Sequence, residues 1–179
     1  VLFRRQRQMC IRDSSIEKAG AKSEDIIITS DADEIINPLI LENVDWFDGY
    51  NHYVALQRCF YYNLNVLREE NWMGPRICNW FKLRNTSVDK LRQSHRDSYR
   101  MEQGGWHWSY FGNAEIVEQK LKACADSHHD SEGIATRMAW GQDPVGRKKF
   151  YDPVPLDESF PQYILDNQEK YSKLITPWN

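Results

Sequence analysis

The chain has 179 residues, a length that suits one domain large enough to bury a hydrophobic core. With 41% hydrophobic and 27% charged residues, it has the composition of a folded globular protein and not of a disordered one. Its apolar runs fall well short of the roughly 20 residues that a membrane-spanning helix needs. A net charge of −3 argues against a face that binds nucleic acid. Four cysteines without a Cys-x-x-Cys pair indicate neither a zinc framework nor a disulfide-dense scaffold.

The first fourteen residues look foreign to the rest of the chain. Arg4 to Ser14 read as the translation of a transposase sequencing adapter, and the agreement extends across the whole run. We therefore expect residues 1–14 to be adapter-derived and residues 15–179 to be the C-terminal part of a single domain whose first strands are missing. The alternative is a basic N-terminal arm or a targeting peptide, although the segment lacks the apolar stretch of a secretory signal.

The first half of the chain is dominated by predicted strands. The apolar, β-branched run Asp25–Ser30 predicts a short strand buried on both faces, the type found in parallel sheets. A helical turn or two is expected at Leu39–Leu41, after Pro38. Aromatic and β-branched residues predict a second strand over Tyr53–Tyr62. A further strand is expected within Trp72–Leu83, after a turn at Gly74-Pro75.

A polar, basic stretch over Asp89–Arg100 comes next and is expected at the surface. Gly104 and Gly105 then open a short aromatic run over residues 106–111. Ile116, Val117, Leu121 and Cys124 follow at helical spacing, with Asn113 as the expected N-cap.

The last third of the chain predicts two more helices. One is expected over Ser131–Trp140, followed by a loop over Gln142–Pro155 that is rich in proline and glycine. The Ser159-x-x-Gln162 pattern predicts a capping box that opens a last helix, which runs to about Ile175. All these elements together predict an α/β domain with a mixed sheet flanked by helices.

The strongest chemical signal is the acidic run Asp31-Ala32-Asp33-Glu34, directly after the first predicted strand. Open α/β sheets bind ligands at the carboxyl ends of their strands. In an extended backbone Asp31 and Asp33 would point to the same side, because strand side chains alternate. Two such carboxylates form a hard oxygen site for Mg²⁺ or Mn²⁺ that leaves positions for the oxygens of a diphosphate. A solvated acidic turn is the alternative.

The stretch Gly105-Trp106-His107-Trp108-Ser109 is the second candidate for a functional site. Gly104 and Gly105 would let the backbone approach a ligand closely. His107 can act as a metal ligand or a proton acceptor, and the two tryptophans can stack on a sugar face. The alternative is the end of a strand with core tryptophans and a hydrogen-bonded histidine.

Three further patterns are weaker candidates for functional sites. Cys124 with His128 and His129 forms only half of a zinc site. Asn85-Thr86-Ser87 fits a glycosylation sequon, which is frequent by chance. The basic residues between Lys90 and Arg100 form either a solvated face or a contact to phosphate.

Three segments, in order, resemble glycosyltransferase family 17, which includes β-1,4-mannosyl-glycoprotein 4-β-N-acetylglucosaminyltransferases. Asp25–Ile35 followed by Pro38 is similar to the Asp-x-Asp segment of the family, with Ile36-Asn37 inserted before the proline. Gly105–Ser109, followed by Ile116 and Lys120-Leu121, resembles its Gly-Trp-His-x-Ser and Lys-Leu pattern. Pro161–Asn167 resembles its closing Pro-x-Tyr-Leu-Leu-x-Asn helix. The upstream half of the family, with much of the nucleotide pocket, has no counterpart in this chain.

The resemblance implies a GT-A-like fold and an inverting, metal-dependent transfer. N-acetylglucosamine or a related sugar would move from a UDP-sugar donor to a hydroxyl of a glycan or glycoprotein acceptor. The compartment would be the cytoplasm for a microbial chain and the Golgi lumen for one like the animal enzymes. A divalent cation, Mn²⁺ or Mg²⁺, would be held by Asp33, Asp31 and His107.

The remaining roles follow from the same resemblance and from the chemistry of transfer. A carboxylate must take the proton of the acceptor hydroxyl. Glu34 is a candidate by proximity, and Glu102 and Glu115 are alternatives. Substrate binding would fall to Trp106, Trp108, Ser109 and Lys120.

Two other classes of function fit the same residues. A glycoside hydrolase also uses two carboxylates, but it would act without a metal and would be insensitive to a chelator. A non-catalytic carbohydrate-binding module would use the aromatic residues as its platform, and Asp33→Asn would not affect it.

Overall fold

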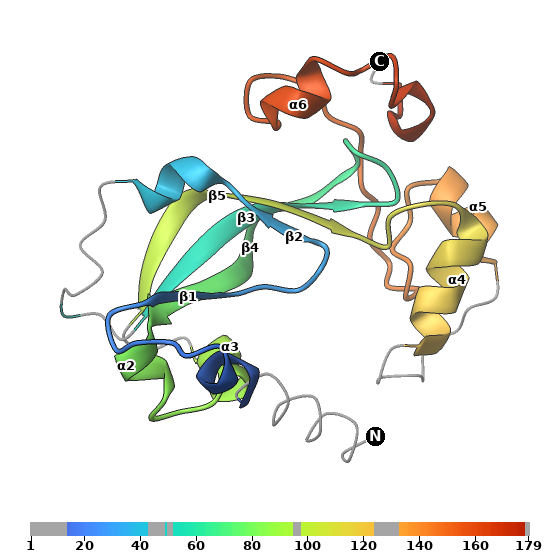
Figure 1. The fold of residues 1–179 in the computed structure, drawn as a ribbon. Coiled ribbons are helices and arrows are strands. Elements are labelled where there is room, and N and C mark those ends of the chain that lie inside the picture. Colours follow the sequence, from blue (N-terminus) through green and yellow to red (C-terminus); the bar gives the residue numbers. More distant parts are fainter. Residues whose placement is uncertain (1–13, 43–48, 50–51, 95–97, 124–132, 178–179) are drawn as a thin grey trace. The chain divides into compact units, whose positions relative to one another are not determined.

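The computed structural model describes residues 14–42, 49, 52–94, 98–123 and 133–177 (Figure 1). Residues 1–13, Cys124 and the pair His128-His129 lie outside the described residues, so the adapter and zinc interpretations stay predictions. The chain is a mixed α/β protein, which confirms the predicted class. Five strands form one curled, mixed sheet in the order β1-β4-β3-β5-β2. The strands are β1 (Ile26–Thr29), β2 (Glu34–Ile36), β3 (His52–Tyr61), β4 (Leu67–Asn79) and β5 (Ser98–Ser109).

Short helices connect and follow these strands. A helix over residues 14–18 precedes β1. The others are the 3-10 helix η1 (Pro38–Leu41), α2 (Trp80–Leu83), α3 (Val88–Gln93), α4 (Ala114–Ala123), α5 (Ile134–Ala139), α6 (Gln162–Leu165) and the 3-10 helix η2 (Ser172–Leu174). In the described part of the chain, no helix has the length and apolar character to cross a membrane.

Two compact units divide the chain. Unit 1 comprises residues 1–57 and 71–106, and unit 2 comprises residues 58–70 and 107–179. Strands β3, β4 and β5 each contribute residues to both units.

Strand β1 of unit 1 departs from the predicted buried parallel strand. It pairs antiparallel with β4, from Ile26 opposite Asn79 to Thr29 opposite Arg76, and it is the edge strand of the sheet. Ile26 packs against the cluster of Tyr53, Ile77 and Met101, whereas Ile27 packs against a second cluster that includes Cys78. The run is therefore apolar because both faces are partly covered, although Ile28 is 41% exposed. An apolar run of this kind does not distinguish parallel from antiparallel pairing.

Strands β3 and β4 show where the sequence pattern succeeded and where it failed. The predicted strand over Tyr53–Tyr62 is confirmed as β3, which is buried along almost its whole length. The predicted turn at Gly74-Pro75 is wrong, because β4 continues through both residues. Proline is tolerated in strands where ladder pairing stops, and Pro75 lies one residue beyond the pairing with β1. Gly74 lies against the side chain of Gln57, so a Cβ atom there would collide with it.

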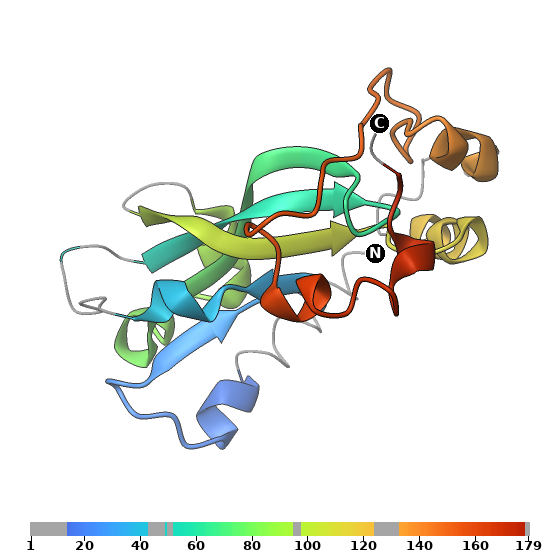
Figure 2. The same ribbon diagram turned by 90° about the horizontal axis from the view of Figure 1, so that it is seen from above.

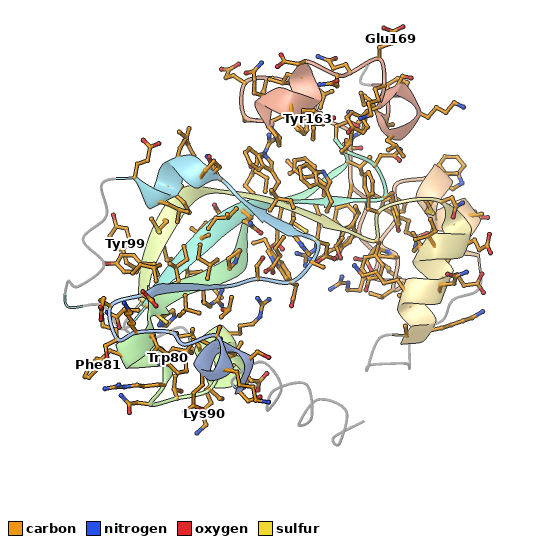
Figure 3. The ribbon with its side chains drawn as sticks, in the orientation of Figure 1. Trp80, Phe81, Lys90, Tyr99, Tyr163 and Glu169 are labelled. Carbon is orange, nitrogen blue, oxygen red and sulfur yellow. The ribbon has the colours of Figure 1, made fainter. Side chains whose placement is uncertain are left out.

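Helices α2 and α3 cover the second cluster, which consists of Cys78, Leu83, Val88 and Leu91. Each helix begins at a side-chain cap: Asn79 accepts a hydrogen bond from the Lys82 N–H, and Ser87 accepts one from the Lys90 N–H. Trp80 packs against the cluster, whereas Phe81 is exposed (Figure 3). The stretch predicted to be a polar surface thus contains a helix with a buried apolar side and the start of β5.

In unit 2 the cap of α4 is confirmed and the capping box of α6 is not. The Asn113 side chain accepts a hydrogen bond from the Ile116 N–H at 3.0 Å, and α4 lies against α5 (Figure 1 and Figure 2). At α6 the N-cap is Pro161, which makes no side-chain cap. Ser159 instead donates its N–H to Asp157 at 3.0 Å. The last predicted helix is shorter than expected, since α6 ends at Leu165.

Candidate functional site

The acidic run forms a tight turn between β1 and β2, so the expected extended backbone is wrong. The Glu34 N–H donates to the Asp31 carbonyl at 3.1 Å, which closes the turn. The Ser30 hydroxyl donates to the Glu34 carbonyl at 2.9 Å. Asp is favoured at the first position of such turns because its carboxylate can accept nearby hydrogen bonds. Asp31 and Asp33 are therefore presented by one turn, and not by one face of a strand.

Glu34 is the buried member of this turn. Its side chain is 0% exposed. Its Oε2 atom accepts the Asp31 N–H at 3.0 Å, and its Oε1 atom accepts the Trp72 indole N–H at 3.2 Å. Burial alone would raise the pKa of Glu34. The hydrogen bond and charge of Arg92, with the N–H groups of Asp31 and Trp72, outweigh burial and hold the pKa below its ordinary value.

Arg92 of α3 joins Asp31 to Glu34. Its Nη2 atom donates to Asp31 Oδ2 at 2.8 Å and to Glu34 Oε1 at 3.1 Å, and its Nη1 atom donates to Glu34 Oε2 at 3.2 Å. Sequence analysis missed this role, because the partners lie 58 and 61 positions apart in the chain. The basic stretch over Asp89–Arg100 was the available signal. For Arg92 the expected solvated face is wrong, because its guanidinium is only 20% exposed and forms an intramolecular ion pair. The contact to phosphate stays a prediction.

Arg76 of β4 binds the backbone of Arg92. Its Nη2 atom donates to the Arg92 carbonyl at 2.9 Å, at the C-terminal end of α3. Its Nη1 atom donates to the Met73 carbonyl at 3.1 Å. Burial and the nearby charge of Arg92 lower the pKa of Arg76 to about 10, against the opposing effect of Glu34. The guanidinium of Arg76 therefore stays charged at neutral pH and fixes the backbone that carries Arg92.

Gly104 and Gly105 serve the packing of strands, which corrects the expectation that they bring the backbone close to a ligand. A Cβ atom on Gly104 would lie 2.6 Å from the backbone nitrogen of Leu56 in β3. Gly105 has a φ of +131°, and a Cβ atom there would collide with the Ile35 carbonyl of β2. Glycine is required at both positions because neighbouring strands approach closely.

The residues that follow are half-buried or buried. Trp106 is half-buried, and His107 is only 6% exposed. Trp108 donates its indole N–H to the Leu64 carbonyl at 3.0 Å and stacks on Phe60, with ring centroids 5.9 Å apart. These contacts favour the core interpretation for Trp108.

Ser109 and Lys120 come together within unit 2. The Lys120 ammonium donates to the Ser109 hydroxyl at 3.4 Å. The same ammonium lies 5.2 Å from the centre of the Tyr110 ring. The two residues therefore form one polar contact between β5 and α4, next to an aromatic ring.

The candidate residues divide between the two units. Asp31, Asp33, Glu34 and Trp106 belong to unit 1, and His107, Trp108, Ser109 and Lys120 belong to unit 2. Within the described ranges, no three His, Cys, Asp or Glu side chains gather as a ready-made metal site. The donor chemistry of Asp31 and Asp33 nevertheless fits Mg²⁺ or Mn²⁺, because such ions are often bound by one or two carboxylates plus substrate phosphates.

Comparison with known proteins identifies the class. The chain matches the model of glycosyltransferase family 17 over residues 3–140, which contain both the acidic turn and Gly105–Ser109. It is therefore a glycosyltransferase. More narrowly, it belongs to glycosyltransferase family 17, a family of N-acetylglucosaminyltransferases. Neither curated proteins nor solved structures give a match. Membership of this family identifies the chain as a transferase, and not as a glycoside hydrolase or a carbohydrate-binding module.

Proposed function

We propose that this chain transfers N-acetylglucosamine from a UDP-sugar to a hydroxyl of a glycan or glycoprotein acceptor, with inversion, on a GT-A-like domain. The observation that carries the proposal is the pair Asp31 and Asp33, presented by one turn in a chain of family 17. The Asp31 side chain is 45% exposed and can therefore be reached by a ligand.

In this proposal Asp31 and Asp33 hold a divalent cation. When bound, Mn²⁺ or Mg²⁺ would neutralise the charge that develops on the leaving diphosphate. The chain's own contribution is to present the two carboxylates from one turn. Arg92 fixes the side chain of Asp31 through the 2.8 Å ion pair.

The acceptor hydroxyl must lose its proton as it attacks the anomeric carbon, and a carboxylate is the expected acceptor. The contacts of Glu34 favour a supporting role, since both of its oxygens already accept hydrogen bonds inside the protein. Glu102 and Glu115, which are both exposed, are the alternatives for the base.

Substrate contacts are proposed for Trp106 and Lys120, which are half-buried, and for Ser109, which is 9% exposed. Trp106 is half-buried, and an indole ring can stack on a sugar face. Ser109 and Lys120 together offer a hydroxyl and an ammonium, which suit a sugar or a phosphate oxygen. Trp108 supports this region through its contact with Phe60.

The direct test is release of UDP from UDP-N-acetylglucosamine, with and without a glycopeptide acceptor. We expect turnover with Mn²⁺, its loss with a chelator, and its loss in Asp33→Asn. The matched control is Glu24→Gln, which removes an exposed carboxylate close to β1 and should keep wild-type turnover. Turnover that survives both the chelator and Asp33→Asn would overturn the metal-dependent mechanism.

A further inference from the structure

We propose that a cavity in unit 2 is a subsite that holds one neutral pyranose ring of the glycan acceptor. The cavity is lined by Leu67 and Arg68 of β4, by residues 149–152 and by Val154, all of which belong to unit 2. Its volume of about 380 Å³ falls within the range of small-molecule sites, roughly 300–1,000 Å³. The inference rests on the proposed function, because it gives a place to one of the two substrates of that reaction.

Backbone hydrogen bonds hold one wall of this cavity, residues 149–152, on two sides. The Tyr151 N–H donates to the Gly141 carbonyl at 2.8 Å. The Leu67 N–H donates to the Asp152 carbonyl at 3.1 Å. This wall is therefore in place before a ligand binds, which lowers the entropic cost of binding.

Phe150 supplies an aromatic surface beside the cavity. It is 63% exposed, whereas the next residue, Tyr151, is 9% exposed. The Tyr151 hydroxyl donates to the buried Asp143 carboxylate at 2.7 Å, so the segment that carries Phe150 is anchored. One face of a pyranose ring consists of C–H groups, which pack well on the electron-rich face of an aromatic ring. Phe150 is therefore suited to stack on a sugar.

The polar part of the lining is balanced in charge. Lys149 and Asp152, both exposed, contribute one charge of each sign. The third charged side chain, Arg68, is ion-paired with Glu69 and lies 5.5 Å from the centre of the Tyr61 ring. The lining thus has no surplus charge that would select an anion. Hydroxyl groups both donate and accept hydrogen bonds, so a neutral sugar matches this set of side chains.

The glycan acceptor suits this cavity better than the nucleotide donor. The donor carries a diphosphate, which needs a metal ion or a surplus of positive charge, and the proposed function places it at the acidic turn of unit 1. A glycan presents several pyranose rings, most of them neutral. A ring remote from the reacting hydroxyl can be held by its own contacts, and this binding energy helps to orient the hydroxyl.

The first test is saturation-transfer-difference NMR of the full chain with four probes, the methyl pyranosides of glucose, mannose, galactose and N-acetylglucosamine. We expect at least one to bind, and its Kd to rise about tenfold in Phe150→Ala, because the stacked ring is lost. Phe150→Trp keeps an aromatic ring and should bind within about threefold of wild type. The matched control is Tyr163→Ala, since Tyr163 is 57% exposed in the same unit but does not line the cavity.

The second test separates the two substrates by their kinetics. In the UDP-release assay, Phe150→Ala should raise the KM for the glycopeptide acceptor and leave the KM for UDP-N-acetylglucosamine unchanged. The reverse pattern would make the cavity part of the donor site and overturn its assignment to the acceptor.

The outcomes also distinguish this inference from the proposed function. Sugar binding without any release of UDP overturns the proposed function and leaves the sugar subsite in place. Absence of binding by all four probes overturns the inference, and so does binding that Phe150→Ala leaves unchanged or that Tyr163→Ala weakens equally. If Phe150→Ala does not fold, as judged by circular dichroism, Asp152→Ala decides, because it removes a hydrogen-bond acceptor from the lining. Unchanged binding by that variant overturns the inference.

Discussion

At the scale of single residues, buried carboxylates are held by specific donors in both units. Glu34 is paired with Arg92 in unit 1. In unit 2 the fully buried Asp143 accepts hydrogen bonds from Arg147 at 3.0 Å and from the Tyr151 hydroxyl at 2.7 Å. Its other oxygen accepts the Val145 N–H at 3.0 Å. The buried carboxylate of Asp143 therefore holds together the loop predicted over Gln142–Pro155, through hydrogen bonds to three residues of that loop.

The first prediction concerns the pH dependence of stability through Asp143. Burial alone would raise the pKa of Asp143, but the hydrogen bonds from Arg147, Tyr151 and Val145 and the charge of Arg147 hold it below its ordinary value. A lowered pKa in the folded state stabilises the protein above the unfolded value of about 3.9, and this stabilisation is lost as the pH falls through the folded value.

Asp143→Asn should therefore reduce the free energy of unfolding by about 2 kcal/mol at neutral pH. The difference from wild type should begin to shrink below about pH 4, where Asp143 of the unfolded chain takes up a proton, and should vanish as the pH falls through the lower pKa of the folded state. Urea unfolding at several pH values measures it, with the exposed Asp166→Asn as control. A difference that stays constant down to pH 2.5 would contradict this account.

The second prediction concerns the glycine pair of β5. Gly104→Ala and Gly105→Ala should each lower the free energy of unfolding by more than about 2 kcal/mol, because both would force strand backbones apart. Gly49→Ala is the control, since nothing lies within 4 Å of a Cβ atom there. Melting temperatures measure the effect. Wild-type stability of Gly105→Ala would mean that the strands do not approach as described.

At the scale of elements, short helices carry side chains to the sheet. The six-residue helix α3 brings Arg92 to the acidic turn, and its capping by Ser87 fixes where it begins. In unit 2, Asn65 ties the C-terminal segment in place. Its amide donates to the carbonyls of Val154 and Thr176, and its carbonyl accepts the Thr176 N–H at 2.9 Å.

The third prediction compares two sequence patterns for helix capping. Asn113→Ala should cost about 1 kcal/mol, because the Asn113 side chain caps α4. Ser159→Ala should cost less than about 0.5 kcal/mol, because Ser159 caps no helix and contacts exposed groups. Urea unfolding of the two variants measures both values. A larger loss in Ser159→Ala would reverse the assignment of the two caps.

The elements that the sequence predicted well are those whose signals are local. The strand β3, the turn at η1 and the cap at Asn113 depend on neighbouring residues alone. The pairing of β1, the continuity of β4 through Gly74-Pro75 and the burial of Glu34 depend on residues far along the chain. Local patterns carry no information on these long-range contacts, and the sequence pattern therefore did not reveal that Arg92 pairs with Asp31 and Glu34.

At the scale of the whole molecule, the candidate residues belong to two compact units joined by three continuous strands. Unit 1 carries the acidic turn with its supporting arginines, and unit 2 carries His107 and the contact between Ser109 and Lys120. Family membership, which the ordered motifs predicted, supplies the class of reaction. The central claim is that Asp31 and Asp33 bind the donor diphosphate through a divalent cation.

The most direct test of this claim is the melting temperature of the chain with UDP, in Mn²⁺ and in a chelator. A ligand that binds only the folded state stabilises it by about 2.7 kcal/mol at a concentration of 100 times its Kd. The account predicts a rise of several degrees with UDP and Mn²⁺ together, no rise with UDP and chelator, and no rise in Asp33→Asn. An equal rise with UDP in the chelator and in Asp33→Asn would contradict it.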